Sequence, residues 1–267
     1  MKIYVTYKFL TKEDRDAFYS AIKENHIQEL SLSDEGCLKY SYTPLEDTVL
    51  SLKEEWISQD LQIKHLNKPH MDLLKELKNQ YSCLTTVRHG TATLNTKRLI
   101  LREFKIEDAN DMYHNWASDE KVTRYLTWPP HKSVDDTKES LALWIQSYEK
   151  GDSYNWGIVV KDKNVLIGNI SVTNIDYKTN TVEVGYCIGR AYWGYGYVAE
   201  ALKEVISYLF KEGYDLVRAR HDKNNPNSGR VMLKAGMKYE GTLRKYAKNN
   251  QGVVDDVLYS ILPEELE

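Results

Sequence analysis

The chain has 267 residues, of which 42% are hydrophobic, and this suits one large domain or two smaller ones. The formal net charge is -3, so no strong field favours nucleic acid over small molecules as a partner. The three cysteines fit neither a disulfide framework nor a zinc site, so we expect reduced thiols, no metal site and a cytoplasmic protein. No apolar signal region or stretch of roughly 18 apolar residues is present, so we expect no membrane partner.

The first ninety residues alternate between strand-like and helical patterns. The expected elements are a strand at 3–10, a helix at 13–30, two strands within 38–56, a helical region at about 58–80 and a strand at 83–89. This βαββαβ order leaves no strand over and predicts a ferredoxin-like α+β domain at 1–90. The polar run after it, HGTATLNTK, is a plausible linker to a second domain at 91–267.

The second segment has more strands and one very clear helix. That helix, at 197–213, places Val198, Leu202 and Val205 on one stripe and ends at Gly213. The other expected elements are strands at 98–104, 155–161, 165–175, 181–189, 216–222, 237–243 and 253–262, and helices at 106–116, 134–151 and 226–236.

Two glycines alternate with aromatic residues immediately before the clear helix, in WGYGYVAEAL (193–202). A helix start offers unpaired N–H groups and the positive end of the helix dipole, and glycines lack the Cβ atoms that would block a phosphate. A tight strand-to-helix turn is the alternative, and it is the more common meaning of such a motif taken alone. A second polar helix entrance, NNPNSGRVMLKAGMKYEG (224–241), favours the phosphate site.

Three motifs in the right order resemble a known family. LNTKRLILREFKIEDAND, WGYGYVAEAL and NPNSGRVMLKAGMKYEGTLR resemble the opening, the acetyl-CoA pyrophosphate loop and the closing signature of the ribosomal-protein branch of GNAT N-acetyltransferases. The resemblance covers about 94–262. It implies a mixed-sheet α/β domain that transfers the acetyl group of acetyl-CoA directly to a primary amine, on a small molecule or a protein N-terminus. Two departures are Val198, where Gly or Ala is common, and Trp193, where Gln or Arg is usual.

The resemblance also assigns the cofactor-binding residues. The pyrophosphate is expected on the N–H groups of Gly194 to Val198, and the pantetheine arm along the strand 181–189, where this strand diverges from 216–222. Asn225 is expected to hold the arm, although helix capping explains it equally well. The predicted cofactor-binding residues are Cys187, Ile188, Gly194, Tyr195, Gly196, Tyr197, Val198 and Asn225.

Acetyl transfer needs a neutral amine, a stabilised oxyanion and a proton for the departing thiolate. The resemblance makes Glu183 the candidate base, acting through water; a solvated strand residue or a salt-bridge partner is the open alternative. Ser228 is expected near the sulfur, where an alcohol solvates a thiolate more readily than it protonates one. Tyr246 and Tyr259 are alternative donors that packing also explains. We expect no nucleophilic role for Cys187, because a buried strand thiol is normally inert.

The acceptor amine is expected to meet TRYLTWPPHKSVDD (123–136), with Trp128 and His131 as possible wall residues. A rigid Pro-Pro connection is the alternative explanation of this segment. The sequence does not name the acceptor: a ribosomal-protein N-terminus, an antibiotic-like amine and a polyamine all remain open. A CoA-binding sensor without turnover is the alternative to an enzyme.

The first segment resembles the antibiotic-biosynthesis-monooxygenase-like domain, a dimeric α+β barrel. DEGCLKYSY, EEW and HLNKPH carry the resemblance, which implies a homodimer formed through this domain. Some members oxidise aromatic compounds without a cofactor and others degrade haem, but the first strand here lacks the Asn of the haem-degrading members. We expect a dimerising or ligand-binding module, with oxygenase activity as the alternative. The candidate residues, matching an ExW…H…PH spacing, are Trp56, His65 and His70.

Overall fold

The computed structural model describes residues 2–148, 153–176 and 179–266. The chain divides into two compact units, Met1–Ala92 and Thr93–Glu267, and each is described by itself. Within the described residues, every helix is too short or too polar to cross a membrane. The last part of the helix predicted at 134–151 lies outside the described residues from 149 on.

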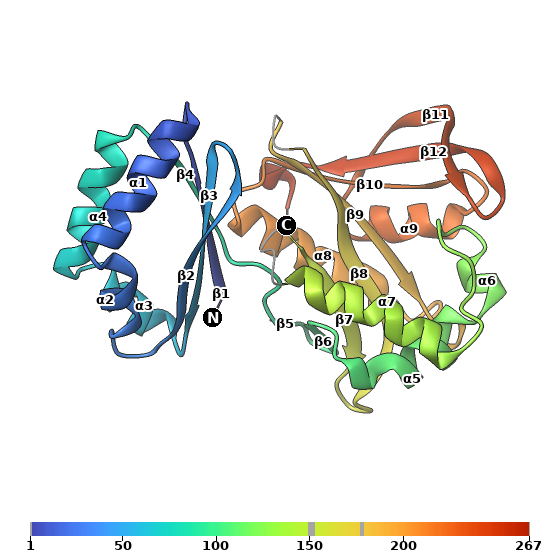
Figure 1. Cartoon of the computed structure of the whole chain (residues 1–267). Coiled ribbons are helices and arrows are strands. Elements are labelled where there is room, and N and C mark those ends of the chain that lie inside the picture. Colours follow the sequence, from blue (N-terminus) through green and yellow to red (C-terminus); the bar gives the residue numbers. More distant parts are fainter. Residues whose placement is uncertain (1, 149–152, 177–178, 267) are drawn as a thin grey trace. The chain divides into compact units, whose positions relative to one another are not determined.

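The N-terminal unit is a four-stranded antiparallel sheet packed against helices (Figure 1). The strand order is β2-β3-β1-β4, so the first strand lies in the middle, paired with β3 and β4. Its elements are β1 (Lys2–Lys8), α1 (Lys12–Glu24), α2 (Ile27–Leu32), β2 (Cys37–Glu46), β3 (Val49–Trp56), α3 (Gln59–His65), α4 (Pro69–Gln80) and β4 (Leu84–Arg88).

The two helical regions predicted in this unit, 13–30 and about 58–80, are each divided into two helices. The predicted helix 13–30 breaks after α1, because His26 adopts the left-handed conformation with φ of 52°. The predicted region 58–80 breaks before Pro69, which occupies the first turn of α4, where its missing N–H and fixed φ are tolerated. Both breaks turn the chain and leave short helices facing the sheet.

The core of the N-terminal unit lies between the sheet and the helices. Alternation along β1 turns Ile3, Val5 and Tyr7 to the helices, where they meet Phe18 and Ile22 of α1. Both α1 side chains are fully buried, and burial of each such side chain stabilises the fold by about 1.5–3 kcal/mol. The predicted strand and helix patterns thus meet in one apolar layer.

The C-terminal unit is an eight-stranded sheet in the order β11-β12-β10-β9-β8-β7-β6-β5. Only β9 and β10 run parallel among the paired strands. The strands are β5 (Leu94–Asn95), β6 (Leu99–Arg102), β7 (Asn155–Val160), β8 (Val165–Asp176), β9 (Thr181–Ile188), β10 (Leu216–Asp222), β11 (Lys238–Asn249) and β12 (Gly252–Ile261).

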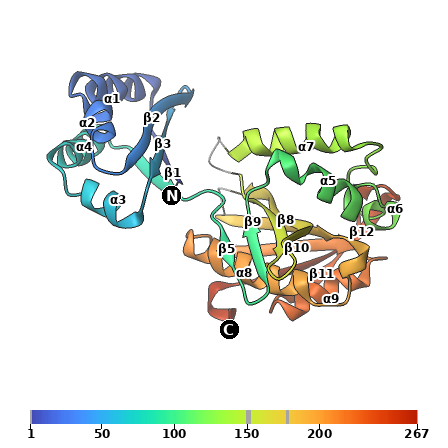
Figure 2. The same ribbon diagram turned by 90° about the horizontal axis from the view of Figure 1, so that it is seen from below.

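Helices cover both faces of this sheet, with α5 and α7 on one side and α8 and α9 on the other (Figure 2). The apolar stripe of α8 is buried, which the sequence pattern predicted. The helix expected at 106–116 is helical but changes type along its length, from 3-10 (Ile106–Asp108) to α (Ala109–Met112) to π (Tyr113–Ala117). The helical elements are η1 (Ile106–Asp108), α5 (Ala109–Met112), η2 (Tyr113–Ala117), α6 (Glu120–Thr123), α7 (Val134–Ser147), η4 (Arg190–Tyr192), α8 (Tyr197–Lys211), α9 (Pro226–Lys234) and η5 (Pro263–Glu265).

Candidate active site

The neighbouring strands β9 and β10 pair over their first halves and then separate. The last paired residues are Val184 and Ala219. Beyond them β9 pairs only with β8, and β10 only with β12. Residues 185–188, which include Cys187 and Ile188, therefore have one strand edge that the sheet does not use. The divergence predicted from the sequence is confirmed, and an open edge of this kind can pair with an amide-bearing ligand.

The glycine loop lies between β9 and α8 and presents its backbone amides. Gly194 and Gly196 have φ of 83° and 76°, the left-handed region that glycine adopts without strain. Within the described chain, no acceptor is found for the N–H groups of 194–199. No protein atom lies within 4 Å of a Cβ built on Gly194, so space for a ligand adjoins these amides. Such a helix start is suited to a phosphate.

A partly buried carboxylate holds this loop against the start of the domain. Glu200, in the first turn of α8, accepts hydrogen bonds from the Arg98 Nε at 2.6 Å and from the Thr96 hydroxyl at 2.6 Å. The same guanidinium donates to the Tyr195 carbonyl at 3.0 Å. Burial alone would raise the pKa of Glu200, but the hydrogen bonds from Thr96 and Arg98 lower it. Arg98 therefore ties the loop to α8.

The structure accounts for the two residues that depart from the usual loop sequence, Val198 and Trp193. The Val198 side chain is buried in the core, so it leaves the loop surface free. The indole of Trp193 donates to the Ile188 carbonyl at 2.9 Å and so joins the loop to the end of β9. Tyr195 and Tyr197 stack with ring centroids 5.8 Å apart, and the Arg98 guanidinium lies 4.5 Å from the Tyr197 ring.

Asn225 and Ser228 lie at the start of α9, across the gap from β9. Asn225 occupies the N-cap position, but its side chain makes no capping hydrogen bond. Its amide is thus available to a ligand, as the resemblance requires. Ser228 lies beside Tyr186 of β9, whose hydroxyl donates to the Ser228 carbonyl at 2.9 Å and is 3.0 Å from the Ser228 Oγ.

Tyr186 is a residue that the sequence reasoning missed. Burial raises the pKa of its phenol, so it stays protonated and can donate a hydrogen bond. Strand alternation could have indicated it. Tyr186 lies between Gly185 and Cys187, so its side chain is on the opposite face of β9 from theirs. That is the face on which its hydroxyl meets Ser228 of α9.

Glu183 lies on the other face of β9, where it meets two arginines of β10. Arg220 Nε donates to its Oε1 at 2.7 Å and Arg218 Nε to its Oε2 at 3.2 Å. Arg220 also donates to Asp256 at 2.5 Å. Glu183 is therefore a salt-bridge partner, which was the alternative to the base role. The base role stays a prediction, because a carboxylate has about four acceptor positions and these bonds use two.

No nucleophilic role was expected for Cys187, and packing was the alternative to a donor role for Tyr246 and Tyr259. Burial raises the pKa of Cys187 to about 12, and its thiol donates to the Asn169 side chain at 2.9 Å. A thiol held in the protonated form is a poor nucleophile. Tyr259 is buried and stacks on His221, whereas Tyr246 is exposed near Arg220.

Trp128 and His131 lie side by side, with ring centroids 5.2 Å apart. Asn250, in the turn between β11 and β12, donates to the Trp128 carbonyl at 2.7 Å. The His131 ring nitrogen Nδ1 lies 2.8 Å from the hydroxyl of Thr137 in α7. This segment is therefore a fixed connection whose side chains border the hairpin; contact with an acceptor stays a prediction.

In the N-terminal unit, Trp56, His65 and His70 are brought together. The Trp56 and His65 rings lie 4.7 Å apart, and the His65 and His70 rings 5.3 Å apart. Both Trp56 and His65 are buried. Two acidic residues that the sequence reasoning did not select join them: Glu54, which accepts from the Trp56 indole at 2.8 Å, and Asp34.

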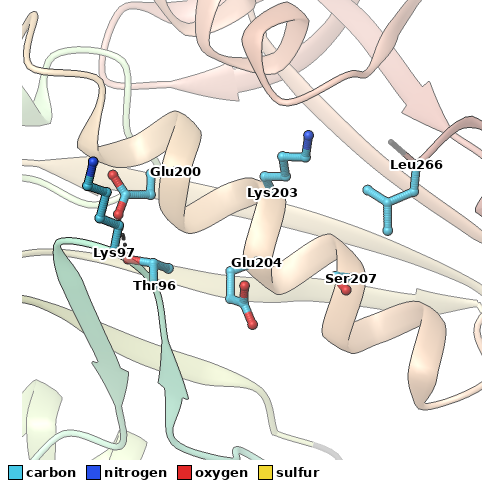
Figure 3. Close-up of a pocket in the computed structure, with 7 residues that line it drawn as sticks. All are labelled: Thr96, Lys97, Glu200, Lys203, Glu204, Ser207 and Leu266. Atoms are coloured by element: carbon cyan, nitrogen blue, oxygen red, sulfur yellow. Dashed lines mark hydrogen bonds between the residues drawn. The ribbon is translucent and has the colours of Figure 1, made fainter.

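A surface hollow of about 390 Å³ lies along α8 (Figure 3). None of the predicted site residues lines it, so it contributes nothing to the gap between β9 and β10. Its lining residues are Thr96, Lys97, Glu200, Lys203, Glu204, Ser207 and Leu266.

Comparisons with known proteins agree with this geometry. The family model described as acetyltransferase (GNAT) domain matches residues 98–238. An uncharacterized N-acetyltransferase p20 of Bacillus licheniformis is 30% identical over 174 residues, which are 65% of this chain and 97% of that protein. The ribosomal-protein-serine acetyltransferase of Escherichia coli (strain K12) is 29% identical over 139 residues, 51% of this chain and 75% of that protein.

A solved structure shares the fold of the C-terminal unit. The microcin C7 self-immunity acetyltransferase MccE, in complex with acetyl-CoA and AMP, matches with a TM-score of 0.57 at 20% identity, over 62% of this chain and 93% of that one. The chain belongs to the GNAT acetyltransferase family. The matched range lies within the C-terminal unit, so the family assignment applies to that unit.

Proposed function

We propose that the C-terminal unit transfers the acetyl group of acetyl-CoA to a primary amine by direct attack. The observation that carries this proposal is the row of N–H groups at 194–199 without protein acceptors, beside the open edge of β9. These amides and the dipole of α8 suit a pyrophosphate. The open edge at 185–188 suits the amides of a pantetheine arm. The uncapped amide of Asn225 faces the same arm from α9.

The proposed reaction forms a nitrogen–carbon bond and breaks the carbon–sulfur bond of the thioester. The amine must lose one proton, which we assign to Glu183 through a bridging water. The thiolate gains its proton from solvent, and until then the Ser228 hydroxyl, held by Tyr186 on the α9 side of the gap, would solvate its charge. In this proposal Glu183 serves the attacking amine, and Ser228 serves the departing thiolate.

The acceptor is a primary amine of a small molecule or a protein N-terminus. The protein-N-terminus proposal is supported by the ribosomal-protein-serine acetyltransferase among the relatives. A mass-shift screen tests the activity: the purified chain with acetyl-CoA in a desalted lysate should give acetylated products. Coenzyme binding without any product or thiol release would instead make the chain a CoA-binding sensor.

A matched pair of glycine variants tests the binding site directly. Gly194→Ala and Gly213→Ala both force alanine into the left-handed region, with φ of 83° and 88° and no protein atom within 4 Å of the new Cβ. Each should lose stability by about 1–2 kcal/mol. Only Gly194→Ala adds a methyl group beside the free amides, so only it should weaken CoA binding in calorimetry. Equal CoA affinities in the two variants would contradict the site.

We also propose that the N-terminal unit is a ferredoxin-like, monooxygenase-like domain that dimerises. The sheet order β2-β3-β1-β4 with helices packed on it supports the ferredoxin-like part. Alternation along β1 turns Thr6 away from the helix-facing Val5 and Tyr7, onto the sheet face that such a dimer would use. Light scattering of the full chain should give twice the mass of one chain; a monomer at micromolar concentration would contradict dimerisation.

A further inference from the structure

We propose that Asp34, His65 and His70 form a binding site for a divalent transition-metal ion in the N-terminal unit. One possible ligand atom from each residue lies within 4.8 Å of the other two. The residues come from three chain segments: Asp34 follows α2, His65 ends α3 and His70 lies in the first turn of α4. The breaks that divide the predicted helices therefore bring these groups together.

The distances are those of a compact ligand set. The Oδ2 atom of Asp34 lies 2.7 Å from the Nδ1 of His65 and 3.2 Å from the Nε2 of His70. Despite the second distance, the Nε2 of His70 makes no hydrogen bond in the described part of the chain. A histidine nitrogen that shares an ion with a carboxylate has this geometry, since its lone pair points at the ion between the two ligands.

Two histidine nitrogens in this cluster are buried without a hydrogen-bonding partner among the described residues. Among the described residues, the Nε2 atoms of His65 and His70 have no hydrogen-bonding partner and almost no contact with solvent. The two side chains are 0% and 8% exposed. Buried polar atoms are normally paired, so the Nε2 of His70, unpaired although it lies 3.2 Å from the Asp34 carboxylate, indicates a missing ligand.

The surroundings hold the ligands in place. The rings of Trp56 and Tyr40 lie 4.7 Å and 5.4 Å from the His65 ring and fix its orientation. Lys68 lies near the carboxylate, with its Nζ 3.9 Å from the Oδ1 of Asp34. Its side chain is half exposed and can turn to solvent when an ion enters. Imidazole and carboxylate ligands suit Zn²⁺, Co²⁺, Fe²⁺ or Ni²⁺.

A bound ion would join the ends of three helices. Binding to the folded state alone stabilises it by mass action, so the melting temperature should rise with metal concentration. The ion competes with the proton that His65 shares with Asp34, so affinity should fall as the pH is lowered. Neither effect depends on the acetyltransferase site, which lies in the other unit.

The test uses the full-length chain without a histidine tag, stripped of metal by a chelator. Titration with Zn²⁺ in a calorimeter should show one site per chain, and Co²⁺ should give visible d–d absorption bands. His70→Gln and Asp34→Asn should each weaken Zn²⁺ binding at least tenfold, in line with the loss of one ligand. His26→Asn changes an exposed histidine at a left-handed position that Asn tolerates, and it should bind Zn²⁺ as the parent does.

Either of two results of the metal titrations would overturn the site. One is the absence of a stoichiometric Zn²⁺ or Co²⁺ complex in the parent chain. The other is equal affinity in the parent, His70→Gln and His26→Asn. His70→Gln, which keeps a polar side chain, keeps the test decisive even when Asp34→Asn fails to fold. Haem binding in place of a bare ion, seen as a Soret band, would also contradict it.

Discussion

Glu183 of β9 and Arg220 of β10 are joined by a hydrogen bond of 2.7 Å beside Val184 and Ala219, the last backbone pair between their strands. Arg218 holds the second oxygen of the same carboxylate. Two side chains of one strand thus fix an acid of the other at the point where the strands part. The Glu183 carboxylate therefore lies at the paired end of the gap between β9 and β10, in which we propose that the thioester binds.

Replacement of Glu183 by Gln tests the base assignment. The variant keeps an oxygen for one arginine but cannot take a proton, so kcat should fall about 100-fold, at the lower end for general-base catalysis. The KM for acetyl-CoA should hardly change. The matched control is Asp256→Asn, which removes another negative charge from the same Arg220. Equal losses in both variants would mean that Glu183 acts only by holding Arg220.

Tyr186→Phe tests the hydroxyl that positions Ser228. The variant removes a hydrogen bond whose net contribution is about 0.5–1.5 kcal/mol, so kcat should fall about three- to tenfold without a change in the KM for acetyl-CoA. Ser228→Ala should lose at least as much, and the double variant no more than Ser228→Ala alone. Tyr246→Phe, at an exposed tyrosine, is the control. Additive losses would show that Tyr186 does not act through Ser228.

Arg98 and Glu200 should matter for binding rather than for the chemical step. Glu200→Gln weakens the charged hydrogen bond that anchors Arg98, and with it the contact of Arg98 to the Tyr195 carbonyl. We expect the KM for acetyl-CoA to rise about tenfold with kcat nearly unchanged, a change of about 1.4 kcal/mol. Glu204→Gln, one turn further along α8, should leave the KM as it is. A fall in kcat alone would contradict a loop-holding role.

The sequence predicts the elements of this protein better than its side-chain pairs. Strand alternation and the stripe of α8 depend on local periodicity, which a single chain displays. The breaks at His26 and Pro69 were missed because a helical pattern continues on both sides of each. The break at His26 depends on one left-handed residue, and such a conformation has little signature outside glycine.

The ion pairs of the candidate site were harder to predict for a different reason. Glu183 meets Arg218 and Arg220 only because β9 and β10 are parallel neighbours in a fixed register, although 35 residues separate the first pair along the chain. The cluster of Asp34 with His70 likewise depends on two helix breaks. A motif can place a loop, but contacts between distant segments follow from packing that local patterns do not encode.

Glu54 gives a prediction about pH in the N-terminal unit. Burial raises the pKa of this carboxyl from 4.5 to about 7, against the opposing effects of the Trp56 indole and His89. Between these values the folded chain keeps a proton that the unfolded chain releases, so stability should fall as the pH rises through this window. The loss is at most about 3.4 kcal/mol, at 1.36 kcal/mol for each unit of pKa.

Glu54→Gln should remove this dependence, because the amide keeps an oxygen for the Trp56 indole and never ionises. Hydrogen exchange of β3 amides in the metal-stripped full chain measures the local stability at pH 5 and pH 8. The parent should exchange more readily at pH 8 once the intrinsic rate is corrected for pH, and the variant should show no such difference. Glu55→Gln, on the opposite face of β3, is the control. The same pH dependence in the parent and Glu54→Gln would contradict a raised pKa at this carboxyl.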